Sequence, residues 1–341
     1  MAWIVACLLA AAWPLAVGVV RPGITGYERA LLPDMVHGRA HQPFVKRQLV
    51  PLAVRAILAI TPESADRALR NVFERSSVVR RLRWPAADAP EFVAALAVMY
   101  ASMVGFLLVL KKLLRTLLTI PETAARIVVL VVAVVLPITF AGKLYIYDFA
   151  QLLLFTAALL CMCERRWGWY YPLLALACLN KETSVLLIAV FVGWMGRRTL
   201  ERGNLPHVVA QMAIGLSICG LLAFVYRDNP GATTEYHLHR NLAGPPTMLG
   251  QVRLALLAAG FLLAVRGTPR ASAFMARGFL WSLLPLLIAT FFLGYIDELR
   301  DYYEALPLGL CLVVLSIGGR WGVCARDDHP SHSNRPRPVR R

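Results

Sequence analysis

Residues 169–194 constrain the fold more than any other part of the chain. Two apolar runs of ten residues, 170–179 and 185–194, flank the five polar residues NKETS. An α-helix rises 1.5 Å per residue, so each run covers about 15 Å, roughly half of a hydrocarbon core of ~30 Å. Either one long helix carries Lys181 and Glu182 in mid-membrane, or two short helices meet at a polar tip.

Both arrangements place the ionisable pair where lipid cannot solvate it. Polar groups at that depth face other protein or a water-filled cavity, and they commonly serve function. Two interpretations remain open for this segment: a substrate-binding group, or a Lys-Glu pair that satisfies itself at an ordinary loop tip. The residues concerned are Asn180, Lys181, Glu182 and Thr183.

Further apolar runs of similar length recur along the chain. In its 341 residues, 58% are hydrophobic and 16% are charged, and a soluble core of this size does not need such runs. We therefore expect an all-α fold, a polytopic transmembrane helical bundle of about eight full spans plus the split pair of short helices. The predicted full spans are 2–20, 92–110, 127–142, 149–163, 208–226, 254–265, 279–295 and 305–318.

The basic residues predict the orientation of the bundle. They cluster in the short loops after the second, fourth and sixth full spans and after the split element, and the positive-inside rule places such loops in the cytoplasm. Both flanks of the split element are then cytoplasmic, which favours two short helices with an outer tip. The formal net charge of +16 is thus a topology marker; no nucleic-acid-binding motif accompanies it.

The predicted domain organisation is a transmembrane domain over residues 1–319 and a disordered, basic, cytoplasmic tail over 320–341. The N-terminus is expected on the cytoplasmic side as well. Residues 21–90 then form a long outer loop, although it is rich in Lys and Arg, because loops of this length often escape the charge bias. Within it, 49–60 is apolar but too short to span, so we expect an interfacial helix.

This topology brings four polar segments to the outer face: 27–47, 143–148, 180–183 and 297–304. Carboxylates and cations around an outward-open apolar groove suit a substrate that is part lipid and part polar head. The alternative for the last segment alone is a loop of solvated charges. The candidate substrate-binding residues are Arg47, Lys143, Asp148, Asn180, Lys181, Glu182, Thr183, Glu298 and Arg300.

Three short elements of the chain resemble a known family. PFVKRQLVP at 43–51 is similar to a P-F/Y-x-x-R-x-L-x-P element, LNKETS at 179–184 to L-N-R-E-T, and DELRDYYEALP at 297–307 to E-x-R followed by a proline. In this order they resemble elements of the GT-C-type polytopic membrane glycosyltransferase superfamily, in its bacterial, uncharacterised branch. Each element is short, and their order and spacing carry most of the resemblance.

The resemblance implies transfer of a sugar from a polyprenyl-phosphate donor to an acceptor on the outer face of the bacterial cytoplasmic (inner) membrane. In such enzymes an acid of the first outer loop acts as catalytic base, which makes Glu28 and Asp34 the candidates here. The family often has two adjacent acids at this place, whereas this chain has Tyr27-Glu28-Arg29 and an isolated Asp34. The implied partners are a lipid-linked sugar donor and membrane lipids. A cation or a divalent metal would stand near the phosphate.

Two other function classes stay open. A transporter of a lipid-linked or anionic substrate would use the split element as a discontinuous helix, although related halves are not apparent. A non-catalytic lipid-binding membrane protein would keep the arginines and dispense with Glu28 and Asp34. Two residue triplets have spacings that could suit a metal, but we favour ordinary polar loops for both: Asp34, His37 and His41, and Glu235, His237 and His239.

Overall fold

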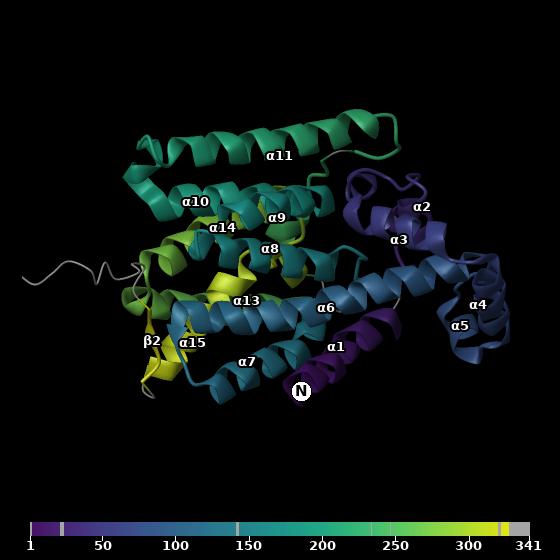
Figure 1. The fold of residues 1–341 in the computed structure, drawn as a ribbon, viewed down its shortest axis with the longest axis horizontal. Coiled ribbons are helices and arrows are strands. Elements are labelled where there is room, and N and C mark those ends of the chain that lie inside the picture. Colours follow the sequence, from purple (N-terminus) through teal and green to yellow (C-terminus); the bar gives the residue numbers. More distant parts are fainter. Residues whose placement is uncertain are drawn as a thin grey trace, which may run out of the picture.

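The computed structural model describes residues 2–20, 24–140, 143–232, 234–245, 247–319 and 322–326. Over these residues the chain is an all-α bundle, as predicted, with a single pair of two-residue strands. Six helical stretches in the described part are long and apolar enough to cross a membrane, which identifies an integral membrane protein. Most of the helices run side by side along the long axis of the molecule (Figure 1).

Each of the eight predicted full spans corresponds to one helix. Five of the helices reach the length of a full crossing, whereas α7, α8 and α15 are shorter, because a proline turn (η4, Leu136–Ile138) follows α7 and polar loops precede α8 and α15. The eight helices are α1 (Ala2–Val20), α6 (Ala89–Leu117), α7 (Glu122–Val135), α8 (Asp148–Cys163), α11 (Leu205–Val225), α13 (Met248–Gly267), α14 (Ala273–Leu293) and α15 (Leu306–Gly318).

The split element forms two short helices, as predicted. Helix α9 (Trp167–Asn180) ends where Lys181 adopts an extended conformation, and α10 (Leu186–Met195) follows the 3-10 turn η5 (Glu182–Val185). A second 3-10 turn, η6 (Gly196–Leu200), follows α10. Together η5, α10 and η6 form the sixth long apolar stretch, Glu182–Leu200. The start of α9 and the end of α10 lie close together, because Trp167 and Met195 line one pocket. The chain therefore enters and leaves at one end of the bundle.

Residues 24–88, which we call the N-terminal segment, gather at the other end of the bundle (Figure 1). The apolar helix predicted at 49–60 is present with these bounds and packs on α6, and its interfacial position stays a prediction. The ring of Trp84 stacks on Phe92 of α6 at 4.4 Å and on Phe73 of α4 at 6.2 Å, which anchors the projecting helices. The helices of the segment are α2 (Leu32–Val36), α3 (Leu49–Ile60), α4 (Glu63–Arg75) and α5 (Ser77–Leu82), with the 3-10 turns η1 (Glu28–Ala30), η2 (Phe44–Lys46) and η3 (Ala86–Asp88).

The C-terminal region differs from the prediction. We expected disorder from residue 320, but β2 (Cys324–Ala325) pairs antiparallel with β1 (Leu118–Thr119) at the end of α6. The backbone bonds of this pair order the chain there; residues 327–341 lie outside the described part. The elements that remain are α12 (Leu238–Ala243) and the 3-10 turns η7 (Thr268–Arg270) and η8 (Leu299–Tyr302).

Candidate active site

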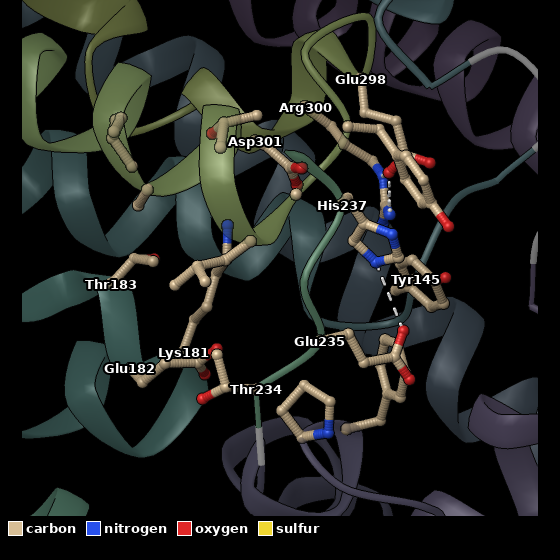
Figure 2. Close-up of a pocket in the computed structure, with 18 of the residues that line it drawn as sticks. Tyr145, Lys181, Glu182, Thr183, Thr234, Glu235, His237, Glu298, Arg300 and Asp301 are labelled. Atoms are coloured by element: carbon tan, nitrogen blue, oxygen red, sulfur yellow. Dashed lines mark hydrogen bonds and ion pairs between the residues drawn. The ribbon is translucent and has the colours of Figure 1, made fainter. Parts of the chain in front are cut away.

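A polar cavity of about 450 Å³ lies at the end of the bundle that carries the N-terminal segment. All four segments that we predicted to converge contribute to its wall, and a fifth, around residues 234–237, joins them. Figure 2 shows Glu298, Arg300 and Asp301 on one side and Lys181, Glu182 and Thr183 on another. The lining includes one histidine and eight charged residues: His237, Arg47, Lys143, Lys181, Glu182, Glu235, Glu298, Arg300 and Asp301.

Arg47 and Glu182 join the N-terminal segment to the tip of the split element. The guanidinium of Arg47 donates to both carboxylate oxygens of Glu182, with Nη2 to Oε1 at 2.7 Å and Nε to Oε2 at 3.2 Å. It also donates to the hydroxyl of Tyr147 and lies 4.4 Å from the centre of that ring. This fork geometry fixes both the carboxylate and the guanidinium at the cavity wall.

Arg300 contacts two carboxylates and an aromatic ring at the cavity wall. Its Nη2 lies 2.6 Å from Oε2 of Glu298, and its Nη1 lies 3.7 Å from Oδ2 of the buried Asp148. Its guanidinium carbon stands 4.1 Å from the centre of the Tyr145 ring. Lys143 reaches the other oxygen of Glu298 at 3.4 Å. Burial acts to raise the pKa of Glu298, but Arg300 and Lys143 outweigh it and lower that pKa, so Glu298 is a fixed anion.

Beneath the cavity, a buried polar network holds the tip of the split element. Nζ of Lys181 lies 3.2 Å from Oε1 of Glu304, which is fully buried. Gln151 donates to the same carboxylate at 3.0 Å, and Thr183 donates to it as well. The buried Asn180 donates to Oε1 of Gln151 at 3.1 Å. Asn180 and Asp148 therefore position the wall from behind; they do not line the cavity.

Asp301 is the functional candidate that our sequence analysis did not select. It lines the cavity, and no hydrogen bond or ion pair of its carboxylate is found within the described part of the chain. Burial raises its pKa to about 6, although the neighbouring Arg300 acts in the opposite direction. A carboxyl group with this pKa exchanges protons near neutral pH, as a general base must.

Neither of the acids predicted as catalytic base lines the cavity. Glu28 is exposed on the turn η1; its neighbour Tyr27 faces the cavity instead. Asp34 lies on α2, where Arg39 approaches its carboxylate at 3.5 Å. The placement of Glu28 and Asp34 in the site is therefore corrected: the turn η1 carries Glu28, and helix α2 carries Asp34, outside the lining of the cavity.

The fifth segment brings Glu235 and His237 to the cavity; both belong to a residue triplet whose spacing could suit a metal. Oε2 of Glu235 lies 3.4 Å from Nε2 of His237, whose ring packs 4.2 Å from that of Tyr295. Arg29 also pairs with Glu235, which connects this segment to the N-terminal segment. In the other triplet, Nε2 of His37 lies 2.8 Å from Oε1 of Glu91, in hydrogen-bond contact. No group of three or more His, Cys, Asp or Glu side chains in the described part is arranged to hold a metal ion.

An apolar groove of about 320 Å³ adjoins the polar cavity. It lies among α7, α13, α14 and α15, and its walls are almost wholly apolar, with Gly260 on its floor. The turn η8 separates the two spaces: Leu299 and Tyr302 line the groove, whereas Arg300 and Asp301 line the cavity. A single 3-10 turn therefore divides a polar site from an apolar one.

No protein-family model, no curated protein and no solved structure matches this chain. The function is therefore inferred from the charges, the pairing and the two adjoining spaces of the site.

Proposed function

We propose that this chain is a membrane glycosyltransferase that moves a sugar from a polyprenyl-phosphate donor to an acceptor bound in the polar cavity. The observation that carries the proposal is the position of η8 between the apolar groove and the cavity. A polyprenyl-phosphate sugar has a long apolar tail and an anionic, hydroxyl-rich head. Such a molecule needs one space of each kind in contact with the other.

The cations of the cavity suit the phosphate of that donor. Lys143 is the most accessible of them, with 44% of its side chain exposed, and it stands beside Arg300 through their shared partner Glu298. As the sugar leaves, charge develops on the phosphate oxygen that departs. Ammonium and guanidinium groups held in place by carboxylates stabilise that charge without reorganising.

Asp301 supplies the base in this proposal, in place of Glu28 and Asp34. It takes the proton of the acceptor hydroxyl while the acceptor oxygen bonds to the anomeric carbon. The bond between that carbon and the phosphate oxygen breaks, and its electron pair leaves with the polyprenyl phosphate. The raised pKa of Asp301, about 6, makes it a stronger base than an ordinary aspartate, yet leaves it mostly ionised at pH 7.

The proposal places the cavity on the outer face of a bacterial inner membrane. The support is the distribution of basic residues, because the end of the bundle opposite the cavity carries Lys111, Lys112 and Arg115 at the end of α6. A donor in the outer leaflet would then reach the groove sideways from the lipid.

The test is analysis of lipid-linked sugars in a deletion strain. We expect the unused donor to accumulate, wild-type protein to reverse this, and Asp301→Asn to be made in normal amount without reversing it. Glu28→Gln is the matched control, because it removes a carboxylate outside the cavity and should restore turnover. Full restoration by Asp301→Asn, or no change in lipid-linked sugars on deletion, would contradict the proposal.

One observation supports the transporter alternative, the buried ion pair of Lys181 and Glu304. Lys181 lies between the two halves of the split element, and Glu304 lies just after η8. A transporter would expose the tip of that element to each side in turn. If the chain is a transferase, Thr183→Cys should react with a membrane-impermeant thiol reagent added on one side of the membrane but not on the other. Reaction from both sides would favour transport.

A further inference from the structure

A second cavity lies at the end of α6 that is remote from the polar site. Its volume is about 400 Å³, and within the described part of the chain every ionisable residue that lines it is a cation. Four cations in one cavity repel one another unless an anion is present. The lining residues are Lys111, Lys112, Arg115, Thr116 and Arg326.

Nearby carboxylates compensate these cations only in part. Glu122 lies 2.9 Å from Nζ of Lys111 and also pairs with Arg115, while Glu164 lies 3.4 Å from Nζ of Lys112. Both acids are shared, Glu122 with Arg126 and Glu164 with Arg166. Arg326 has no carboxylate partner in the described part of the chain. Among the described residues, the cluster therefore keeps an excess of positive charge.

The C-terminal strand β2 holds Arg326 at this cavity. Its two residues pair with β1 directly after α6, and the backbone N of Arg326 donates to the carbonyl of Leu117 at 2.9 Å. The fold thus returns a segment from the far end of the chain, and that segment adds a cation to three already present. This arrangement concentrates positive charge in one cavity, and such a concentration attracts an anion.

The position of the cavity points to the membrane surface. Two cations lie over the indole ring of Trp3, at the start of α1. Nζ of Lys111 is 5.2 Å and the guanidinium carbon of Arg126 is 5.6 Å from the centre of the ring. Two long apolar helices, α1 and α6, therefore have ends here. Trp and basic residues at the ends of spanning helices lie at the level of the lipid headgroups.

We propose that this cavity binds the phosphate of an anionic phospholipid headgroup. Lys111, Lys112, Arg115 and Arg326 surround the phosphate, and the hydroxyl of Thr116 is available to donate a hydrogen bond to it. The acyl chains extend into the bilayer beside α6. The site is separate from the polar cavity at the other end of the bundle, and it does not depend on the proposed glycosyl transfer.

The test uses the purified full-length protein in a neutral detergent and measures its thermal unfolding with three additives. They are short-chain phosphatidylglycerol, short-chain phosphatidylcholine and inorganic phosphate. We expect a saturable rise in Tm with phosphatidylglycerol alone. Arg326→Gln should require about fivefold more of this lipid for half the effect, as expected for the loss of one basic contact near the surface.

Arg202→Gln is the matched control, because it removes an equal charge from an exposed position of the same end outside the cavity. It should leave the response unchanged. Arg115→Gln provides a second variant, with the same expected loss as Arg326→Gln. Equal rises with both lipids, an equal rise with inorganic phosphate, or a wild-type response in both cavity variants would overturn the proposal.

Discussion

Two carboxylates three positions apart show how neighbours decide the role of a residue. Glu298 forms ion pairs with Arg300 at 2.6 Å and with Lys143 at 3.4 Å. These two cations lower the pKa of Glu298, although burial acts to raise it. Asp301 is on the same turn, but its carboxylate has no such partner in the described structure, and its pKa rises to about 6. The fixed anion orients cations, and the free one can accept a proton.

The proton-accepting role predicts a pH profile. If Asp301 must be ionised, kcat/KM should rise about tenfold per pH unit below pH ~6 and level off above it, because only the deprotonated fraction is active. Asp301→Asn should lower the rate by roughly 10²- to 10⁴-fold and remove this limb of the profile. The measurement is kcat/KM for glycosyl transfer from pH 4.5 to 8. A variant that keeps both rate and profile would show that another group is the base.

At the scale of elements, short turns do the positioning. The turn η5 presents Glu182 and Thr183 between α9 and α10, and η8 presents Arg300 and Asp301 just before α15. The turn η5 leads directly into α10, and η8 leads into α15 after three residues. Lys181 and Glu304, which flank these turns, pair at 3.2 Å. The site therefore depends on the interruption of apolar helices by short polar turns.

The groove beside η8 can be tested by filling it. Gly260 lines the groove, and a Cβ there would meet nothing within 4 Å, so Gly260→Leu should fold and should also favour the helix α13. Its larger side chain occupies the space proposed for the prenyl tail. We expect KM for the lipid-linked donor to rise severalfold while KM for the acceptor stays unchanged.

Gly220→Leu on α11 is the matched control, since a Cβ there also meets nothing within 4 Å and the residue lies outside the groove. The measurement is initial rate against donor concentration for both variants. An unchanged donor KM in Gly260→Leu would argue that the tail lies elsewhere.

At the scale of the whole molecule, the two ends of the bundle differ in chemistry. One end carries the polar cavity with acids and bases in close pairs, and the other carries the basic cavity beside β1 and β2. Figure 1 shows α2 to α5 at the first end and β2 at the second. The basic end carries the loop residues from which we predicted a cytoplasmic location.

The orientation predicts the behaviour of reporter fusions. A reporter fused after Arg341 should be active only in a cytoplasmic assay, and one inserted near Asp66, an exposed or half-exposed part of α4, only in an outside assay. Two reporters measure this: alkaline phosphatase, which is active only outside the cytoplasm because it needs disulfides, and a fluorescent protein that fluoresces only in the cytoplasm. An outside C-terminus would invert the bundle and move the polar cavity to the cytoplasmic face.

Local patterns were sufficient for the elements and for part of the site. Apolar length located a helix at each of the eight predicted spans, the apolar helix at 49–60 and the two halves of the split element, because hydropathy and chain length act locally. The placement of basic loops then implied that four polar segments converge, and the cavity contains residues from all four, among them Arg47, Glu182 and Arg300.

Only the tertiary structure decided which acids belong to the cavity. The sequence shows Glu28, Asp34 and Asp301 alike as carboxylates in polar segments, but side-chain direction on a short turn depends on the packing of neighbouring helices. Burial without a partner, which sets the pKa of Asp301, depends in the same way on residues distant in the chain. The strand at Cys324, too, forms only because α6 ends beside it and offers its backbone bonds.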